Sequence, residues 1–137
     1  MSDKYYQTIK KLQPEDWNKK IDDNWTVKDV VSHLVGWERE AAIQLPFVWE
    51  TKRKPWFVEN KNYDEFNQKS VEQFSKLTTE ELLQEWEMWS QKLEKEIDEI
   101  TEGQLREYGD LFDWVFDYGD NSHYEYHMRE IEEIVKQ

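Results

Sequence analysis

The sequence predicts an all-helical protein, and three observations support this. Hydrophobic residues recur three and four positions apart over long stretches, and no sustained alternation of apolar and polar residues occurs. Only 4 Gly and 3 Pro punctuate the 137 residues, which suits long helices with few tight turns. The length, and the lack of an internal repeat, low-complexity stretch or linker, indicate a single domain over residues 1–137.

The first segment is expected to hold a short helix followed by a turn. The helix covers about residues 3–12, and Pro14 opens a second turn that ends at Ile21. The apolar residues of this helix recur at helical spacing: Tyr5, Tyr6, Ile9 and Leu12.

The second helix is expected to begin after Thr26 and to run to Pro46. Thr26 is a favourable N-cap residue and Asp29 follows three positions later, which is close to a capping box. Residues 47–61, FVWETKRKPWFVENK, have no clear period. We interpret them as a long connection across one end of a helical bundle.

The second half of the chain is expected to hold two further helices, a short element and a last helix. One helix covers residues 63–77, and a longer one starts at a Thr78 or Thr79 cap and ends near Gly103. A short apolar element at residues 111–116 precedes Gly119, and the last helix covers residues 121–136. The pattern predicts four principal helices.

Charge and composition exclude several classes of function. The 31 acidic and 18 basic residues give a net charge of −13, which repels nucleic acid and anionic lipid headgroups. No apolar run approaches the ~20 residues that span a bilayer, and the first residues do not resemble a signal peptide, so we expect a cytoplasmic protein. The absence of cysteine excludes disulfides, thiolate ligands and a protein-borne thiol nucleophile. Any thiol in the chemistry must come from outside.

The three histidines are the candidate metal ligands. His123 and His127 are four residues apart on the last helix, so their side chains project from one face. His127 falls within the apolar stripe of that helix and His123 lies at its edge. His33 lies beside the buried stripe of the second helix, marked by Val30, Leu34, Trp37 and Ala41.

A shared divalent metal ion would satisfy all three buried imidazoles at once. The alternative is that each histidine is a hydrogen-bonded core residue, which is common for a single histidine on an apolar face. Three neutral imidazoles would leave the ion its charge and an open position, as in sites that activate water or a thiol. Imidazole ligands suit Zn, Ni, Fe, Co or Cu.

Two motifs resemble those of a known family. The stretch NWTVKDVVSHLVGWE (residues 24–38) resembles the Trp-Thr/Ser-x-x-Asp-x-x-x-His-Leu motif of the DinB-like superfamily, followed by its Trp-Glu. This superfamily is also called the YfiT-like or mycothiol-dependent maleylpyruvate isomerase N-terminal group. The stretch HYEYHMREI (residues 123–131) is similar to its His-x-x-x-His motif on the last helix.

The resemblance implies a fold and a site. The fold is an up-down-down-up four-helix bundle, frequently a homodimer, with a divalent metal ion such as Zn, Ni or Fe held by His33, His123 and His127. Members with known activities use the metal to activate a low-molecular-weight thiol or water, as S-transferases, isomerases or hydrolases acting on a small-molecule substrate.

Several polar residues could support the ligands. Asp29, one turn before His33, could accept its ring N–H, although a role in the helix cap is an equal alternative. Asn67 stands where related proteins often carry Asn, and it is a second candidate for this supporting role. Glu125 and Glu130 are expected to be surface charges.

Two classes of function therefore compete. The first is a metal-dependent enzyme, most simply a thiol S-transferase or a hydrolase. The second is a non-catalytic metal-binding bundle with a stress-related or small-molecule-binding role. The sequence has no glycine-rich loop that would bind a nucleotide, and it lacks the Ser, His and Asp order of a catalytic triad. Nucleotide-dependent chemistry and triad-based hydrolysis are therefore not candidates.

Overall fold

The computed structural model describes residues 3–115 and 123–136, without the side chains of residues 3–5, 123 and 124. Over these ranges the chain is all-helical, which confirms the predicted class, and its only extended pairing is an isolated bridge between Lys20 and Thr26. The described elements are α1 (Asp3–Lys10), η1 (Pro14–Asn18), α2 (Val27–Thr51), α3 (Trp56–Glu59), α4 (Asp64–Phe74), α5 (Thr79–Asp98), α6 (Glu102–Tyr108), η2 (Gly109–Leu111), η3 (Asp113–Val115) and α7 (His123–Lys136).

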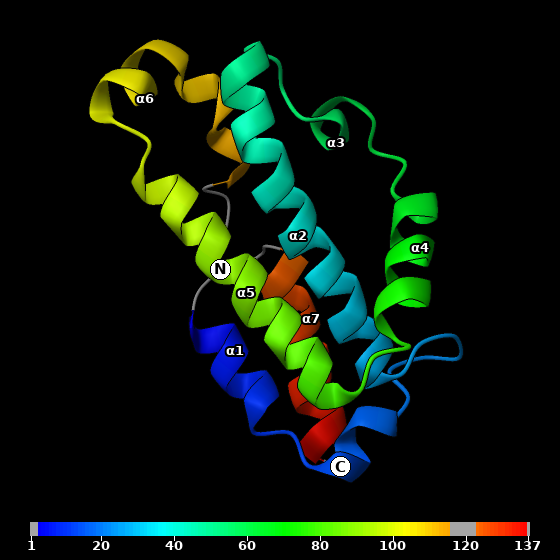
Figure 1. Ribbon diagram of the computed structural model, residues 1–137. Helices are drawn as coiled ribbons and strands as arrows, with labels where there is room; N and C mark the ends of the chain where they lie inside the picture. Colours follow the sequence, from blue (N-terminus) through cyan, green and yellow to red (C-terminus); the bar gives the residue numbers. More distant parts are fainter. Residues whose placement is uncertain (1–2, 116–122, 137) are drawn as a thin grey trace.

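Helix α2 is the centre of the molecule (Figure 1). It packs against α5 on one side and α4 on the other, and α1 and α7 contact each other and the α2–α5 pair. Helices α2 and α5 run in the same direction, and the chain returns between them through α3 and α4. The connection predicted for residues 47–61 is therefore shorter at its start, because residues 47–51 belong to α2, and it contains the short helix α3. Together with α4, which corresponds to the helix predicted for residues 63–77, it forms the crossover.

The N-terminus of α2 is fixed by the predicted capping box. The Thr26 hydroxyl accepts the N–H of Asp29 at 3.2 Å, and the Asp29 carboxylate accepts the N–H of Thr26 at 3.0 Å. These two bonds satisfy backbone donors that the first turn of a helix leaves without partners. The cap sets where α2 begins and so fixes the rotational position of every later residue of the helix.

The prediction that α2 ends at Pro46 is wrong, because the helix continues to Thr51 with Pro46 inside it. A proline inside a helix removes one N–H and its ring clashes with the carbonyl four residues earlier, which destabilises the helix, so burial beyond it must outweigh this cost. Val48 supplies that burial, being fully inaccessible to solvent. The helix ends at Lys52, which has a left-handed conformation with φ of 57° and places its ammonium 3.3 Å from the centre of the Trp49 ring.

The predicted end of α5 near Gly103 is also wrong. Helix α5 ends at Asp98, and Gly103 lies inside the short helix α6. A second capping box causes this separation: the Thr101 hydroxyl accepts the N–H of Gln104 at 3.1 Å, and the Gln104 side chain accepts the N–H of Thr101 at 2.8 Å. The predicted short element is the pair of 3-10 turns η2 and η3; its last residue, 116, and Gly119 lie outside the described residues.

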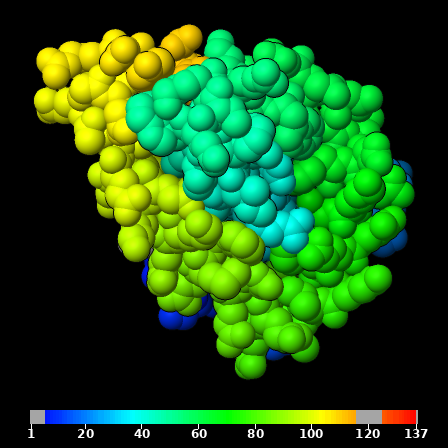
Figure 2. Space-filling model, turned by 45° about the horizontal axis from the view of Figure 1, so that its top comes forward, coloured from blue at the N-terminus to red at the C-terminus, as the bar shows by residue number. Residues whose placement is uncertain are grey.

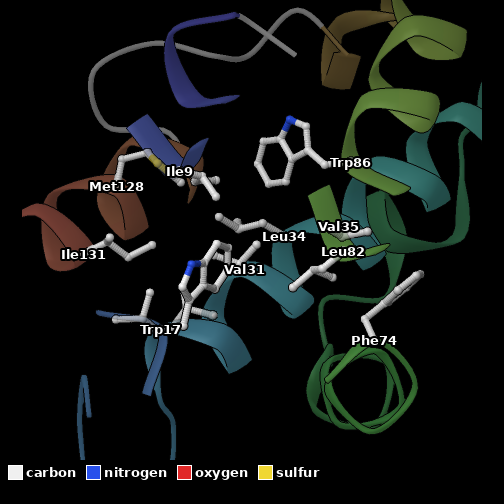
Figure 3. Packing of buried hydrophobic residues seen from close by; sticks show 12 residues of the cluster. Ile9, Trp17, Val31, Leu34, Val35, Phe74, Leu82, Trp86, Met128 and Ile131 are labelled. Carbon is white, nitrogen blue, oxygen red and sulfur yellow. The ribbon is translucent and has the colours of Figure 1, made fainter. Parts of the chain in front are cut away.

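The buried hydrophobic residues form two clusters along α2. The first joins α1, η1, α2, α4, α5 and α7, and Figure 3 shows its side chains converging around Leu34 and Val31. The second lies at the far end of α2 and joins it to α5 and the η2–η3 segment. The members of this second cluster are Ala42, Leu45, Val48, Leu93, Leu111, Phe112 and Val115.

Helices α2 and α4 approach closely at Gly36. A Cβ atom at this position would lie 2.3 Å from the Ser70 hydroxyl oxygen and 2.5 Å from its Cβ atom. Both distances are too short for a real contact, so glycine is what allows the two helices to lie this close. Among the described helices, none combines the length and the apolar character that crossing a membrane requires.

Candidate metal centre

His33 lies in the second turn of α2 and is almost completely buried. Its exposed fraction is 2%, which confirms that it faces the interior. The capping box at Thr26 sets the rotation of α2, and the buried neighbours Val30 and Leu34 hold this face of the helix in the first hydrophobic cluster. His33 is therefore carried by one of the best-anchored segments of the molecule.

The ring of His127 on α7 meets the ring of His33. The two ring centroids are 5.1 Å apart and the ring planes are inclined by 80°. Met128 and Ile131 dock the same helix onto the first cluster, which turns His127 toward α2. Residues 94 positions apart in the sequence are thus brought together.

Glu130 is the residue that sequence analysis missed. Its carboxylate oxygen Oε1 lies 2.7 Å from Nδ1 of His127, and its side chain is 28% exposed. The expectation that Glu130 is a surface charge is wrong. Its position three residues after His127, on the same face of the helix, was the available signal.

Burial determines the charge of the His127 ring, and the contact with Glu130 determines which ring nitrogen carries the proton. Burial lowers the pKa of His127 to about 4, so the ring is neutral at neutral pH. With a carboxylate at Nδ1, the single ring proton is assigned to Nδ1 and donated to Glu130. The other nitrogen, Nε2, then carries the lone pair with which a neutral imidazole binds a metal ion.

Glu130 is itself in an unusual electrostatic environment. Burial raises its pKa, and the negative charge of Asp22 raises it further. Asp22 belongs to the loop before α2, where its carboxylate accepts the N–H groups of Asn24 and Trp25, both at 2.8 Å. Two carboxylates therefore lie close enough to influence each other's charge beside the His127 ring.

The third predicted ligand, His123, is the first residue of α7, and its side chain lies outside the described residues. In an α-helix it stands one turn before His127. Among the side chains that the structure describes, no group of three or more His, Cys, Asp or Glu residues could hold a metal ion. Two of the three predicted ligands therefore meet in the described part of the chain.

Aromatic rings border the histidine pair. The Trp25 indole lies 5.1 Å from the His33 ring, at an angle of 48°, and the largely exposed Tyr126 ring lies 5.4 Å from the His127 ring. A hollow of about 320 Å³ opens beside Trp25. Its other lining residues, all from α4, are Asp64, Asn67, Gln68, Val71 and Glu72.

The two residues predicted to support the ligands have other partners in the structure. Asp29 completes the cap of α2, which is the alternative given for it above. Asn67 accepts the indole N–H of Trp37 at 2.9 Å and so joins α4 to α2, one turn beyond His33. A role for either residue at the metal ion stays a prediction.

Glu38, which ends the first motif, is fully buried between α2 and α5. The Ser90 hydroxyl donates to its carboxylate at 3.2 Å. Glu38 was not singled out from the sequence as a functional residue, although it ends the first motif and lies four residues after Leu34, on the buried face of the helix.

A family model of the DinB superfamily matches residues 1–131. The chain belongs to the DinB superfamily. No curated protein and no solved structure matches the chain. Membership of the DinB superfamily agrees with the all-helical fold, and the match covers both histidine-containing motifs.

The donor set fits a divalent ion. Neutral imidazole nitrogens are common ligands of Zn and of other first-row transition metals. Histidine ligands typically donate their other ring N–H to a carboxylate, which is the arrangement of His127 and Glu130. The chemistry of the described pair thus suits a metal centre in this DinB protein.

Proposed function

We propose that this DinB protein binds a divalent metal ion through His33, His123 and His127 and uses it in a reaction between a small molecule and either a low-molecular-weight thiol or water. The observation that carries the proposal is the meeting of the His33 and His127 rings, with Glu130 holding Nδ1 of His127. An S-transferase is the simplest enzyme of this kind.

The proposed chemistry follows from the charge of the ion. A divalent ion with only neutral ligands lowers the pKa of a thiol or water molecule beside it, so that the nucleophile forms near neutral pH. The chain has no cysteine, so a thiol must come from solution. Glu130 and the helix cap at Thr26 keep the histidines in position throughout.

An aromatic cluster supports a small apolar electrophile as the substrate. The Trp37 ring, one turn beyond His33, lies 4.4 Å from the Phe66 ring and 5.9 Å from the Trp56 ring. Phe57 and Tyr63 complete the cluster, at 5.4 Å and 5.2 Å from Trp37. Such rings offer flat apolar surfaces on which an aromatic electrophile could stack.

We also propose that α1, α2, α5 and α7 are the four helices of the DinB bundle, with α3 and α4 in the crossover. The parallel course of α2 and α5 supports this assignment, because an up-down-down-up bundle requires its second and third helices to be parallel.

The second candidate is a non-catalytic metal-binding bundle, and the burial of the histidines favours it. His33 is 2% exposed and the His127 side chain 12% exposed, which leaves little access for a substrate. Closed sites of this kind are typical of structural ions.

A conjugation assay tests the enzyme. Purified protein loaded with Zn, Ni or Fe is incubated with a small thiol and 1-chloro-2,4-dinitrobenzene; the sulfur–carbon bond forms, chloride leaves with its electron pair, and the thiol proton goes to the buffer. We expect metal-dependent turnover that His127→Ala abolishes and that Glu133→Ala, an exposed change on the same helix, leaves unchanged. If no thiol or electrophile in a panel gives metal-dependent turnover, the S-transferase is wrong; if metal-dependent hydrolysis is absent as well, the non-catalytic candidate replaces the enzyme.

A further inference from the structure

A second hollow lies at the other end of the molecule from the first hydrophobic cluster. It occupies about 310 Å³ between the C-terminal half of α2, the end of α5 and α6. Figure 2 looks toward this end, where α2 abuts α5 and α6. The lining residues are Leu45, Pro46, Trp49, Glu96, Glu99, Ile100, Gln104 and Phe112. None of the histidines is among them.

The lining combines apolar walls with negative charge. Trp49 and Phe112 lie nearly parallel, with ring centroids 6.1 Å apart and planes inclined by 29°, and Leu45 and Ile100 add aliphatic surface. Two of the eight lining residues are carboxylates and none is basic. The volume is at the small end of the range for ligand pockets, which is about 300–1,000 Å³.

Glu96 is the polar residue that points to a ligand class. Its Oε1 accepts from Lys92 at 2.6 Å, whereas its Oε2 is buried without a hydrogen-bond partner in the described structure. Burial also raises the pKa of Glu96. A buried carboxylate oxygen that lacks a donor is costly, and a cationic N–H donor relieves that cost better than a neutral one. Glu96 is one of the residues that line the hollow, so a cationic donor that enters the hollow lies next to this side chain.

We propose that this hollow binds a small organic ammonium ion with an apolar body, the ammonium at Glu96 and the body between Trp49, Phe112 and Ile100. Glu99, at the exposed rim, adds to the negative potential that attracts a cation. The site is separate from the metal centre, so its occupancy does not depend on the proposed function.

Calorimetric titration with 2-phenylethylamine tests the site in the intact protein. We expect saturable binding, and about tenfold weaker binding of the neutral analogue 2-phenylethanol, because a charge-assisted hydrogen bond is lost. Glu96→Gln should weaken amine binding by about tenfold. The matched control is Asp98→Asn, which removes an exposed charge from the same helix outside the lining and should leave the affinity within about twofold.

Three results would overturn the proposal without any variant. One is the absence of saturable amine binding up to about 10 mM, and another is equal affinity for the amine and the alcohol. A third is amine-dependent NMR shift changes that avoid Trp49, Ile100 and Phe112. Circular dichroism shows whether the Glu96→Gln variant has folded. If it has not, the comparison of amine and alcohol affinities in the wild-type protein decides whether the proposal holds.

Discussion

His33 and His127 reach each other because each lies on the apolar face of a helix that packs into the same core. What distinguishes them from ordinary core histidines is the carboxylate at Nδ1 of His127. A hydrogen bond at one ring nitrogen fixes the tautomer, so the direction in which the other nitrogen presents its lone pair is also fixed.

Glu130→Gln is expected to weaken metal binding without abolishing it. The amide keeps the shape of the side chain but holds the His127 ring less strongly, and such changes typically cost about 10–100-fold in metal affinity. Competition with a chromogenic chelator measures the affinity. Glu133→Gln is the control, being an exposed residue of the same helix, and it should have no effect. Equal affinities of the two variants would contradict the role given to Glu130.

At the residue scale, the sequence predicted which way the histidine side chains face, but it did not predict which residue contacts His127. The phase of the apolar stripes placed His33 and His127 on inward faces; His33 is buried, and the His127 side chain is 12% exposed. The partner of His127 was not predicted, because the exposure of a glutamate at a helix edge depends on what packs there. Here Asp22, from the loop before α2, lies close enough to raise the pKa of Glu130, and the position of a loop follows from tertiary structure.

Helices α2 and α4 make the element contact that is most sensitive to a small change. Gly36→Ala would place a methyl group within 2.5 Å of two Ser70 atoms. Either the helices separate or the serine moves, and we expect a loss of about 1–3 kcal/mol in the free energy of unfolding, as for overpacked cores. Urea unfolding measures it.

Gly103→Ala is the control for this change. The nearest atom to its Cβ would be the Thr101 hydroxyl oxygen at an ordinary 3.8 Å. We expect no loss and a gain of up to about 1 kcal/mol, because alanine loses less conformational entropy than glycine in a helix. A Gly36→Ala protein as stable as Gly103→Ala would show that α2 and α4 do not approach as described.

The carboxyl group of Asp16, in the turn η1, makes the stability of the fold depend on pH, and the direction of this dependence follows from its pKa. The N–H of Gln13 and the ammonium of Lys19 hold the pKa of Asp16 below its usual value of 3.8. This stabilisation is present above that value and is lost as the pH falls through the lower pKa of the folded state. Asp16→Asn should therefore destabilise the protein at pH 7 and flatten the fall of its melting temperature in acid. Parallel acid-side melting curves of the two proteins would contradict this.

At the element scale, helix starts were predictable and helix ends were not. The Thr26 box and the Thr78 box are local patterns, and both form in the structure. Pro46 failed as an end signal because Val48 and its neighbours pack into the second cluster. Gly103 failed because the Thr101 box starts another helix. In both cases burial or a competing cap outweighed a single breaker residue.

For the whole molecule, removing the metal ion should leave the fold intact. The two hydrophobic clusters are built from residues other than the histidines, so burial of apolar side chains stabilises the packing of the helices without the metal ion. We expect treatment with a chelator to lower the melting temperature by a few degrees through loss of binding energy, with helical circular dichroism retained at 25 °C. Unfolding on chelation would favour the structural-ion candidate.

The homodimer and the cytoplasmic location implied at the start stay predictions. Light scattering of the purified protein measures the first directly. The all-helical class and the DinB superfamily were predictable because they depend on periodicity and on two local motifs. The crossover through α3 and α4 was not, since the packing of Trp37 with Asn67 and its aromatic neighbours involves residues from several segments.

The most direct test of the metal centre is elemental analysis of the purified protein after loading with Zn, Ni or Fe and desalting. We expect about one ion per chain in the wild type, loss of that ion in His33→Ala and in His127→Ala, and retention in Tyr126→Phe, an exposed neighbour that supplies no nitrogen ligand. A wild-type protein that retains no ion, or histidine variants that retain as much as Tyr126→Phe, would contradict this expectation.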